Sequence, residues 1–377
     1  MKKFLLSFIF IGILPTFAYA QTAAPIETAA RQAYMIDAAT GTTLYNKNGD
    51  QPMTPSSMSK MMTVYMAFDA LKTGKLSLNQ ELVTSEHAWK QEGSRMFVNV
   101  GQRVKVDDLL RGVIIQSGND AAVVLAETLG GSESGFAQMM NDEGLKLGLT
   151  HSHFVNATGL PDSAHYSTAH DLAVLAMALI QDFPQDYHYF SETEFTYNNI
   201  KQGNRNPLLY RNMNVDGLKT GHTDEGGYGL TASALRDARR LILVLNGMDD
   251  MQMRADESAK LLDWGYREFG LYPVIKAGEK LAETKVWLGK KHEEPLLASS
   301  DVVLTLPRSA RSGLKISISY AQPVEAPIAK GQPLGTLTVS APGMETKEVP
   351  LLAGEDVEQV GLVAQMKAKL RFLLARG

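Results

Sequence analysis

Apolar and polar residues follow two different periods along the chain, and the changes between them outline the fold. Residues 31–37 and 42–46 form short strand-like runs, and Gly41 between them suits a turn that needs a positive φ angle. From about residue 77 to residue 175 the period is mostly helical. Strand character then returns in residues 215–221, 227–234 and 240–247, and a helix follows from about Arg254 to Phe269. Strands at both ends and helices between them predict an α+β fold in which helices surround a sheet.

A further helix is predicted just after the first strand pair. Pro55 and the neighbouring serines favour a helix start. Apolar residues then recur at helical spacing and predict a buried face made of Met61, Val64, Tyr65, Phe68 and Leu71.

Beyond Gly270 the pattern changes to short alternating runs separated by glycine and proline. The alternation is clearest in Lys315–Tyr320. Residues 271–354 are therefore predicted to form a small all-β domain, and this domain contains no group of residues that indicates chemistry.

The last segment, residues 355–377, has a helical pattern with one apolar stripe. Its final eleven residues carry four positive charges, from Lys367, Lys369, Arg371 and Arg376. This combination is typical of a helix that lies on an anionic membrane surface. The alternative is a terminal helix that packs on its own domain.

Residues 1–20 have the features of a secretory signal peptide. Two lysines precede an apolar run from Phe4 to Leu14, and Ala18-Tyr19-Ala20 provides a small-residue cleavage signal. We expect an exported protein whose mature chain starts near Gln21. An uncleaved N-terminal anchor is the alternative, although the run is short for a membrane span.

Composition narrows the possible functions. The chain contains no cysteine, which excludes a cysteine nucleophile and cysteine-ligated zinc. The formal net charge is −4, and loss of the charges of Lys2 and Lys3 makes it −6, so no nucleic-acid partner is expected. His151-Ser152-His153 has no third ligand at a suitable spacing, so no metal site is predicted. The expected domains are the signal 1–20, an α+β domain 21–270, the β domain 271–354 and the helix 355–377.

Ser57 and Lys60 form a candidate catalytic pair at the predicted helix start. Side chains three residues apart lie on the same face of a helix. A serine hydroxyl becomes a good nucleophile only if a nearby base takes its proton, and lysine can do so when its neutral form is favoured. On this stretch alone, a capping serine beside a solvated lysine is the simpler interpretation.

Two further motifs change that interpretation. Ser57-x-x-Lys60 is followed in order by Ser117-Gly118-Asn119, between two predicted helices, and by Lys219-Thr220-Gly221, on a predicted strand. Together the three resemble the active-site set of the penicillin-recognising serine enzymes, the penicillin-binding proteins and serine β-lactamases.

Other residues resemble one branch of that family, the low-molecular-mass D-alanyl-D-alanine carboxypeptidases. They are Lys60–Thr63, Asn156–Leu160 and Asp216–Thr223. The branch also has a β-rich second domain and a C-terminal amphipathic helix, so the resemblance covers essentially the whole mature chain. It implies removal of the terminal D-alanine from peptidoglycan pentapeptide stems by the domain 21–270, without a cofactor, and inhibition by β-lactam antibiotics. It also implies a periplasmic enzyme that lies peripherally on the inner membrane.

The resemblance also implies roles for individual residues. Ser57 would be the nucleophile and Lys60 its base, while Ser117 and Lys219 would relay a proton to the departing amine. Asn119 would hold the substrate's amide backbone. The strand from Lys219 through Gly221 to His222 would pair with the peptide, and the N–H groups of Ser57 and His222 would form the oxyanion hole.

The substrate ends in a carboxylate, so a cation should receive it. Arg254 lies where the branch places a carboxylate-binding arginine, and Thr220 is a second expected donor. Only its spacing supports this assignment of Arg254, and a surface arginine at a helix start is the alternative.

One departure limits the activity expected of the site. The middle motif is Ser-Gly-Asn instead of the Ser-Asp-Asn of class A β-lactamases, and no Glu-x-x-Leu-Asn follows it. Rapid β-lactam hydrolysis is therefore disfavoured. A D,D-endopeptidase, a slow β-lactamase and a non-catalytic wall-binding protein remain as alternatives.

Overall fold

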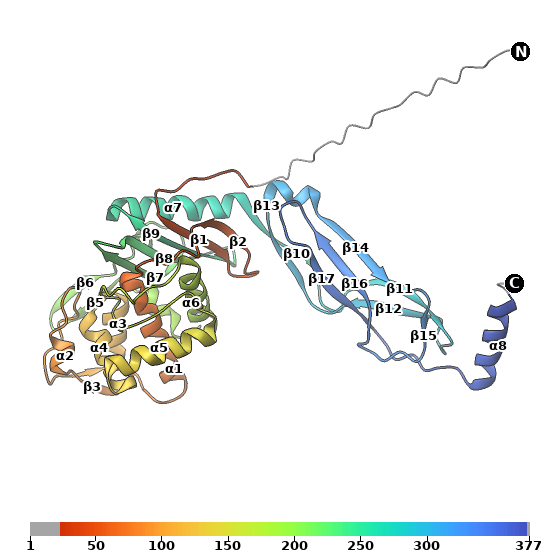
Figure 1. Ribbon diagram of the computed structural model, residues 1–377, viewed down its shortest axis with the longest axis horizontal. Coiled ribbons are helices and arrows are strands. Elements are labelled where there is room, and N and C mark those ends of the chain that lie inside the picture. Colours follow the sequence, from red (N-terminus) through yellow and green to blue (C-terminus); the bar gives the residue numbers. More distant parts are fainter. Residues whose placement is uncertain (1–22, 375–377) are drawn as a thin grey trace, which may run out of the picture. The chain divides into compact units, whose positions relative to one another are not determined.

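A computed structural model describes residues 23–374 of the chain (Figure 1). The predicted signal, residues 1–20, and Arg376 lie outside the described residues. The chain forms two compact units. The first contains Ala24–Val274 with Val303–Thr305, and the second contains Ile275–Val302 and the chain from Leu306 onward.

A five-stranded antiparallel sheet organises the first unit, with the strand order β2-β1-β9-β8-β7. Its strands are β1 (Gln32–Asp37), β2 (Thr43–Lys47), β7 (Val215–Thr223), β8 (Gly227–Arg236) and β9 (Arg239–Met248). Gly41 has a φ of +69° in the β1–β2 turn, as its position in the sequence predicts. Strand β7, which carries Lys219-Thr220-Gly221, lies at an edge of the sheet.

Helices cover both faces of this sheet (Figure 1). The helix α7 (Met251–Glu268) packs on β8 and β9, and α6 (Ala169–Asp182) packs on β1 and β9 from the other face. The remaining helices of the unit are α1 (Lys60–Lys72), α2 (Glu86–Trp89), α3 (Val106–Ile114), α4 (Asn119–Gly130) and α5 (Glu133–Leu147). Their apolar faces form one buried core that includes Met61, Phe68, Leu109, Val123 and Phe136.

Short strands and 3₁₀ turns complete the first unit. Two small antiparallel hairpins are β3 (Glu81–Val83) with β4 (Arg103–Lys105), and β5 (Glu194–Tyr197) with β6 (Ile200–Gly203). The 3₁₀ turns are η1 (Ser56–Ser59), η2 (Tyr187–Ser191) and η3 (Pro207–Tyr210).

Two helix starts in the first unit differ from the sequence-based expectation. The Ser57 stretch is a 3₁₀ turn, and the α-helix itself begins at Lys60. Helix α7 begins at Met251, three residues before the predicted start, because the Asp250 side chain accepts a hydrogen bond from the Met253 N–H at 2.7 Å.

Helix α6 starts with half of a capping box. Thr168 Oγ1 accepts the Asp171 N–H at 3.0 Å. The Asp171 carboxylate instead accepts the N–H of His151 at 2.9 Å and the hydroxyl of Ser152 at 2.7 Å. In a full capping box this carboxylate would accept the N–H of Thr168, but here it bonds to these two more distant residues instead.

The second unit is built on a six-stranded sheet with the order β14-β16-β17-β12-β11-β15. It has a small core of its own, to which Val286, Ile328 and Val357 contribute. Its elements are β11 (Lys280–Trp287), β12 (Glu293–Ala298), η4 (Arg308–Gly313), β14 (Lys315–Tyr320), β15 (Val324–Glu325), β16 (Pro333–Ser340) and β17 (Lys347–Ala353). Two more strands, β10 (Phe269–Ile275) and β13 (Val302–Pro307), contain the boundaries between the units.

The last helix is shorter than predicted. Helix α8 spans Leu362–Leu374, whereas the pattern predicts a helix from residue 355. The preceding residues bond to the β domain instead: Val357 bridges to Ile328, and the Val360 N–H bonds to the Leu288 carbonyl at 2.9 Å. These bonds hold the segment in an extended form, so the helix begins only after it.

Candidate active site

Ser57 and Lys60 lie together at the junction of the 3₁₀ turn and helix α1. Lys60 Nζ lies 2.9 Å from Ser57 Oγ. The amine is fully buried and also donates to the Thr158 carbonyl at 2.5 Å. The loop that carries this carbonyl is held by Asn156, whose Oδ1 accepts the N–H groups of Thr158 and Gly159. The Lys60 amine is therefore fixed from two sides.

Burial favours the neutral form of this amine. The pKa of Lys60 is lowered to about 7, mainly by removal from water and also by the positive charge of Arg205. Near neutral pH a large fraction of Lys60 is therefore unprotonated. A neutral amine 2.9 Å from a hydroxyl can accept its proton, as base-assisted attack by serine requires.

Ser117 and Lys219 form a second serine–lysine pair. Lys219 Nζ donates to Ser117 Oγ at 2.9 Å, from β7 to the loop before α4. Ser117 has a φ of +60°, an unfavourable angle for a residue with a Cβ, and only 1% of its surface is exposed. Burial lowers the pKa of Lys219 well below its usual value, and the nearby cations Lys60, Arg205 and Arg254 act in the same direction.

These motifs meet at one cavity of about 410 Å³. Of the residues that the sequence singles out, six line it: Ser57, Ser117, Thr220, Gly221, His222 and Arg254. Lys60 and Lys219 are buried and reach the cavity through the hydroxyl groups of Ser57 and Ser117.

Strand β7 approaches the nucleophile turn closely. A Cβ on Gly221 would lie 2.8 Å from the Pro55 carbonyl oxygen, so only glycine fits there without a shift. The next residue, His222, is exposed and its ring lies 3.9 Å from that of Tyr228. The edge of β7 therefore borders the cavity directly beside Ser57.

Arg254 provides a cation in the cavity. Its side chain comes from the first turn of α7 and is only 6% exposed. Burial lowers the pKa of its guanidinium to about 10, so the group keeps its charge at neutral pH. Its Nε has no hydrogen-bond partner within residues 23–374 and can therefore donate to a ligand.

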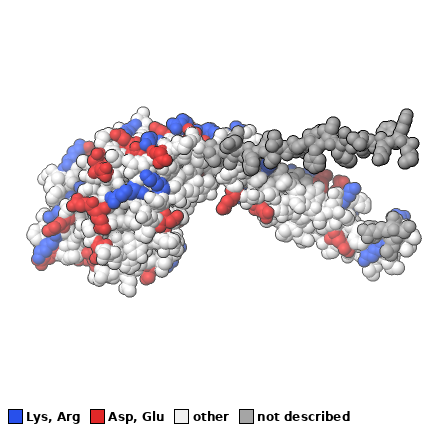
Figure 2. All heavy atoms as spheres, turned by 45° about the horizontal axis from the view of Figure 1, so that its top comes forward, with Lys and Arg blue, Asp and Glu red and all other residues white. Residues whose placement is uncertain are grey.

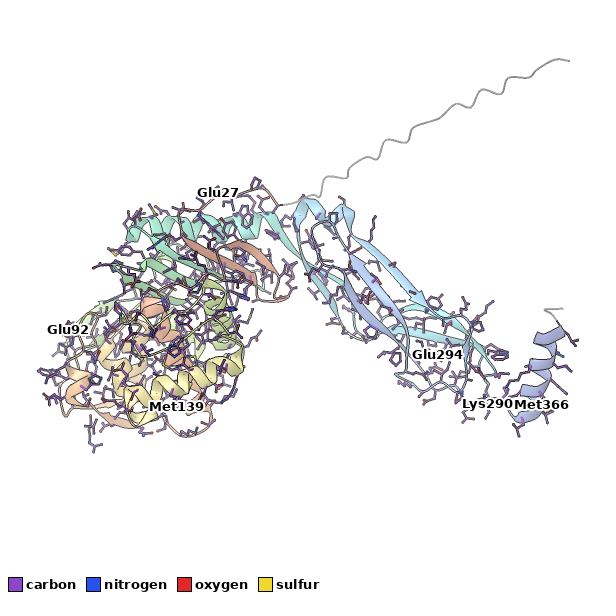
Figure 3. All side chains as sticks on the ribbon, viewed as in Figure 1. Glu27, Glu92, Met139, Lys290, Glu294 and Met366 are labelled. Carbon is purple, nitrogen blue, oxygen red and sulfur yellow. The ribbon has the colours of Figure 1, made fainter. Side chains whose placement is uncertain are left out.

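Asn119 is placed differently from the residues that line the cavity. It is 3% exposed, and its Nδ2 donates to the Glu92 carbonyl at 2.6 Å. Its Oδ1 is buried and lacks a partner in the part of the chain that the structure describes. Glu92 is marked in Figure 3 on the loop that contributes this carbonyl.

Four residues that line the cavity are absent from the sequence-based set: Ser94, Arg205, Tyr228 and Met251. Arg205 donates a hydrogen bond to Ser94 Oγ across 111 positions of the chain. Burial lowers the pKa of Arg205. Neither residue belongs to a periodic pattern or a motif, so the sequence gives no signal for this pair.

The family comparison agrees with this arrangement of motifs. Residues 19–250 match the model of the D-alanyl-D-alanine carboxypeptidase family. Residues 269–359 match the model of the penicillin-binding protein 5 C-terminal domain. The chain belongs to the D-alanyl-D-alanine carboxypeptidase family.

Relatives of this carboxypeptidase match along almost their whole length. The D-alanyl-D-alanine carboxypeptidase DacC of Escherichia coli is 39% identical over 368 residues, which cover 96% of this chain and 92% of that protein. DacA of Haemophilus influenzae is 37% identical over 348 residues, 91% of this chain and 88% of that protein. The solved structure of penicillin-binding protein 5 from Haemophilus influenzae has a TM-score of 0.80 and 37% identity, and the match covers 89% of this chain and 99% of that one.

The family and its structures confirm the predicted identity of the enzyme and its fold class. The chain is a serine-type D-alanyl-D-alanine carboxypeptidase with the penicillin-binding-protein fold and a C-terminal all-β domain. Peptidoglycan peptides and β-lactams are ligands of this family. Within residues 23–374, no helix is both long enough and apolar enough to cross a membrane.

Proposed function

We propose that this carboxypeptidase removes the terminal D-alanine of peptidoglycan pentapeptide stems through an acyl-enzyme on Ser57. The observation that carries the proposal is the contact of 2.9 Å between Ser57 Oγ and the buried Lys60 amine. The lowered pKa of Lys60, about 7, allows this amine to act as a base near neutral pH.

Acylation begins when the neutral Lys60 amine takes the Ser57 proton. Ser57 Oγ attacks the carbonyl carbon of the penultimate D-alanine, and the oxygen of that carbonyl becomes negatively charged. The N–H groups of Ser57 and His222 receive this charge. The peptide lies along the free edge of β7 and forms main-chain hydrogen bonds with it.

The leaving D-alanine needs a proton on its nitrogen. Ser117 and Lys219, 2.9 Å apart, relay to it the proton that Lys60 took from Ser57 as the peptide C–N bond breaks, so Lys60 becomes neutral again. A water molecule then attacks the acyl-enzyme, loses its proton to Lys60 or to this relay, and releases the shortened peptide. Ser57 recovers its hydrogen in the same step, so the enzyme returns to its starting state.

Recognition uses the cations and hydroxyls around the cavity. Arg254 and Thr220 bind the terminal carboxylate, because the Arg254 guanidinium retains an unpaired N–H group there. Asn119 holds the substrate's amide backbone through Oδ1, since its Nδ2 is already bonded to Glu92. Arg205 adds a second positive charge to the same cavity.

β-Lactams acylate the same serine. Ring opening by Ser57 gives a penicilloyl-enzyme in place of the peptidyl-enzyme. A related solved structure, penicillin-binding protein D2 of Listeria monocytogenes, is described in its ampicillin-bound form and is 29% identical over 64% of this chain and 99% of that one. We expect slow release of the penicilloyl group, because the chain lacks the glutamate motif of class A β-lactamases.

The enzyme works outside the cytoplasm and on the membrane surface. In α8 the residues Val363, Met366 and Leu370 are 70%, 72% and 59% exposed, so this apolar stripe faces solvent. Lys367, Lys369 and Arg371 are on the same helix. An exposed apolar stripe with cationic neighbours favours peripheral binding to an anionic membrane.

The activity can be tested with three substrates and one variant. Purified protein and Ser57→Ala receive a soluble pentapeptide, a cross-linked muropeptide dimer and a labelled penicillin. We expect free D-alanine from the pentapeptide, a stable penicillin adduct on Ser57, and neither product from Ser57→Ala. Cleavage of the dimer alone would indicate an endopeptidase, and fast penicillin hydrolysis would indicate a β-lactamase.

A further inference from the structure

Ser56, the residue directly before the nucleophile, is held in an unfavourable conformation. Its φ is +51°, in the left-handed region that residues with a Cβ rarely adopt. Its surface is 1% exposed. A strained, buried residue at this place needs surrounding contacts that maintain it.

One such contact joins Ser56 to the end of β7. Ser56 Oγ lies 2.9 Å from Thr223 Oγ1, although the residues are 167 positions apart. Thr223 Oγ1 also accepts the Gly226 N–H at 3.0 Å, which fixes the orientation of the threonine. The two hydroxyl groups therefore connect the nucleophile turn with the far end of the cavity strand.

Glycines allow the backbone to close around Ser56 from two sides. A Cβ on Gly159 would lie 1.9 Å from the Ser56 carbonyl oxygen. On the β7 side, a Cβ on Gly221 would lie 2.8 Å from the Pro55 oxygen and 3.2 Å from Ser56 Cβ. The turn thus lies between the loop that holds Lys60 and the strand that pairs with substrate.

The positions of Ser56 and Thr223 in the chain indicate what their hydrogen bond does. Ser56 precedes Ser57, and Thr223 follows His222, so the hydroxyl bond joins the immediate neighbours of the two N–H groups that receive the oxyanion. We infer that Ser56 and Thr223 are positioning residues that set the spacing between these two donors. This inference rests on the proposed function, in which Ser57 and His222 form the oxyanion hole. Preorganised donors act on the transition state, so the effect should fall on kcat.

The test compares Ser56→Ala, Thr223→Val and the double variant in D-alanine release from a soluble pentapeptide. Each single variant should lower kcat about tenfold, less than the roughly hundredfold loss expected from deleting a donor, with KM within about twofold. The double variant should be no slower than Thr223→Val alone, because both changes break one bond. The affinity for a peptide boronic acid should fall by the same factor as kcat/KM, because its tetrahedral adduct accepts hydrogen bonds from the same two N–H groups.

Two controls separate positioning from general stability. Thr43→Val breaks another hydroxyl pair, Tyr34 Oη to Thr43 Oγ1 at 2.7 Å, and should leave kcat unchanged. Thr223→Ser keeps the hydroxyl and should retain most of the wild-type kcat. If Ser56→Ala does not fold, Thr223→Val tests the pair from the other side.

Several results would overturn the inference. They are an unchanged kcat in folded Ser56→Ala or Thr223→Val, losses that multiply in the double variant, or boronic acid binding that does not change. A wild-type enzyme that releases no D-alanine and forms no penicillin adduct would instead refute the proposed function on which the inference rests.

Discussion

At the residue scale, the account depends on two lysines that the fold keeps out of water. Lys60 is 0% exposed and Lys219 is 2% exposed, and each contacts one serine hydroxyl at 2.9 Å. Burial disfavours the charged form of an amine, so it lowers the pKa of both groups. The same burial that makes these residues costly to the fold makes them available as proton acceptors.

The charge of Arg205 should affect the pH dependence of the reaction through the pKa of Lys60. The positive charge lowers the pKa of Lys60, so Arg205→Gln should raise that pKa and move the acidic limb of kcat/KM to higher pH. At pH 6.5 we expect a loss of about two- to fivefold relative to wild type, and a smaller loss at pH 8.5. Steady-state kinetics across pH 5.5–9 measures the shift.

Arg205→Lys is the matched control for this prediction. It keeps a positive charge in the cavity and should leave the midpoint of the acidic limb near that of wild type. An equal loss at every pH in Arg205→Gln would show that the residue acts through substrate contact alone.

The sequence predicts part of the residue-scale picture. A serine and a lysine three apart at a helix start predict their proximity, and the structure has them 2.9 Å apart. Ser94 and Arg205 lie in loops without periodicity, 111 positions apart, and only the folded chain brings them together. The single-sequence pattern contains no information on such a contact.

At the element scale, the loop 156–159 positions the Lys60 amine together with the helix that carries this residue. The Thr158 carbonyl holds the Lys60 amine, and Gly159 lies against the Ser56 carbonyl. The sequence predicts helices and strands from periodicity, and most boundaries agree with the structure within a few residues. It misplaces the starts of α7 and α8 because a capping aspartate and tertiary hydrogen bonds decide them.

Gly159→Ala should disrupt this loop. The new Cβ would lie 1.9 Å from the Ser56 oxygen, at a φ of +75°. We expect the free energy of unfolding to fall by more than about 2 kcal/mol, and penicillin acylation to slow because Thr158 no longer holds Lys60. Urea unfolding and the rate of adduct formation measure the two effects.

Gly74→Ala is the control variant: it places a Cβ at nearly the same unfavourable backbone angle as Gly159→Ala but introduces no steric clash. Gly74 has a similar φ of +74°, but a Cβ there would meet nothing within 4 Å. We expect a loss of about 1 kcal/mol in stability and no change in acylation. Equal acylation rates for Gly159→Ala and Gly74→Ala would contradict the role given to the loop.

At the scale of the whole molecule, we propose that chemistry and membrane attachment belong to different units. The cavity is lined by residues of the first unit, and α8 belongs to the second. On the face seen in Figure 2, acidic and basic side chains are interspersed over the first unit. The sequence predicts this division through its change of pattern near residue 270.

Removal of residues 361–377 should therefore separate the two properties. We expect the truncated protein to release D-alanine from a soluble pentapeptide at the wild-type rate but to lose binding to vesicles that contain anionic lipid. Vesicle co-sedimentation and the kinetic assay measure the two outcomes.

Lys367→Glu with Lys369→Glu tests the electrostatic part of this binding without shortening the chain. The double variant should bind anionic vesicles less strongly, and high salt should weaken wild-type binding, because screening reduces attraction to the surface. Full vesicle binding after truncation would contradict the assignment to α8.

The central claim is that a neutral Lys60 activates Ser57, and the pH dependence of penicillin acylation tests it most directly. Mass spectrometry of the digested protein gives the position and the rate of adduct formation at each pH. We predict an adduct on Ser57 whose rate rises through a midpoint near pH 7, the pKa to which burial lowers Lys60, and no adduct in Lys60→Ala. An adduct on another residue, or a rate in wild type that does not change between pH 5.5 and pH 9, would contradict the account.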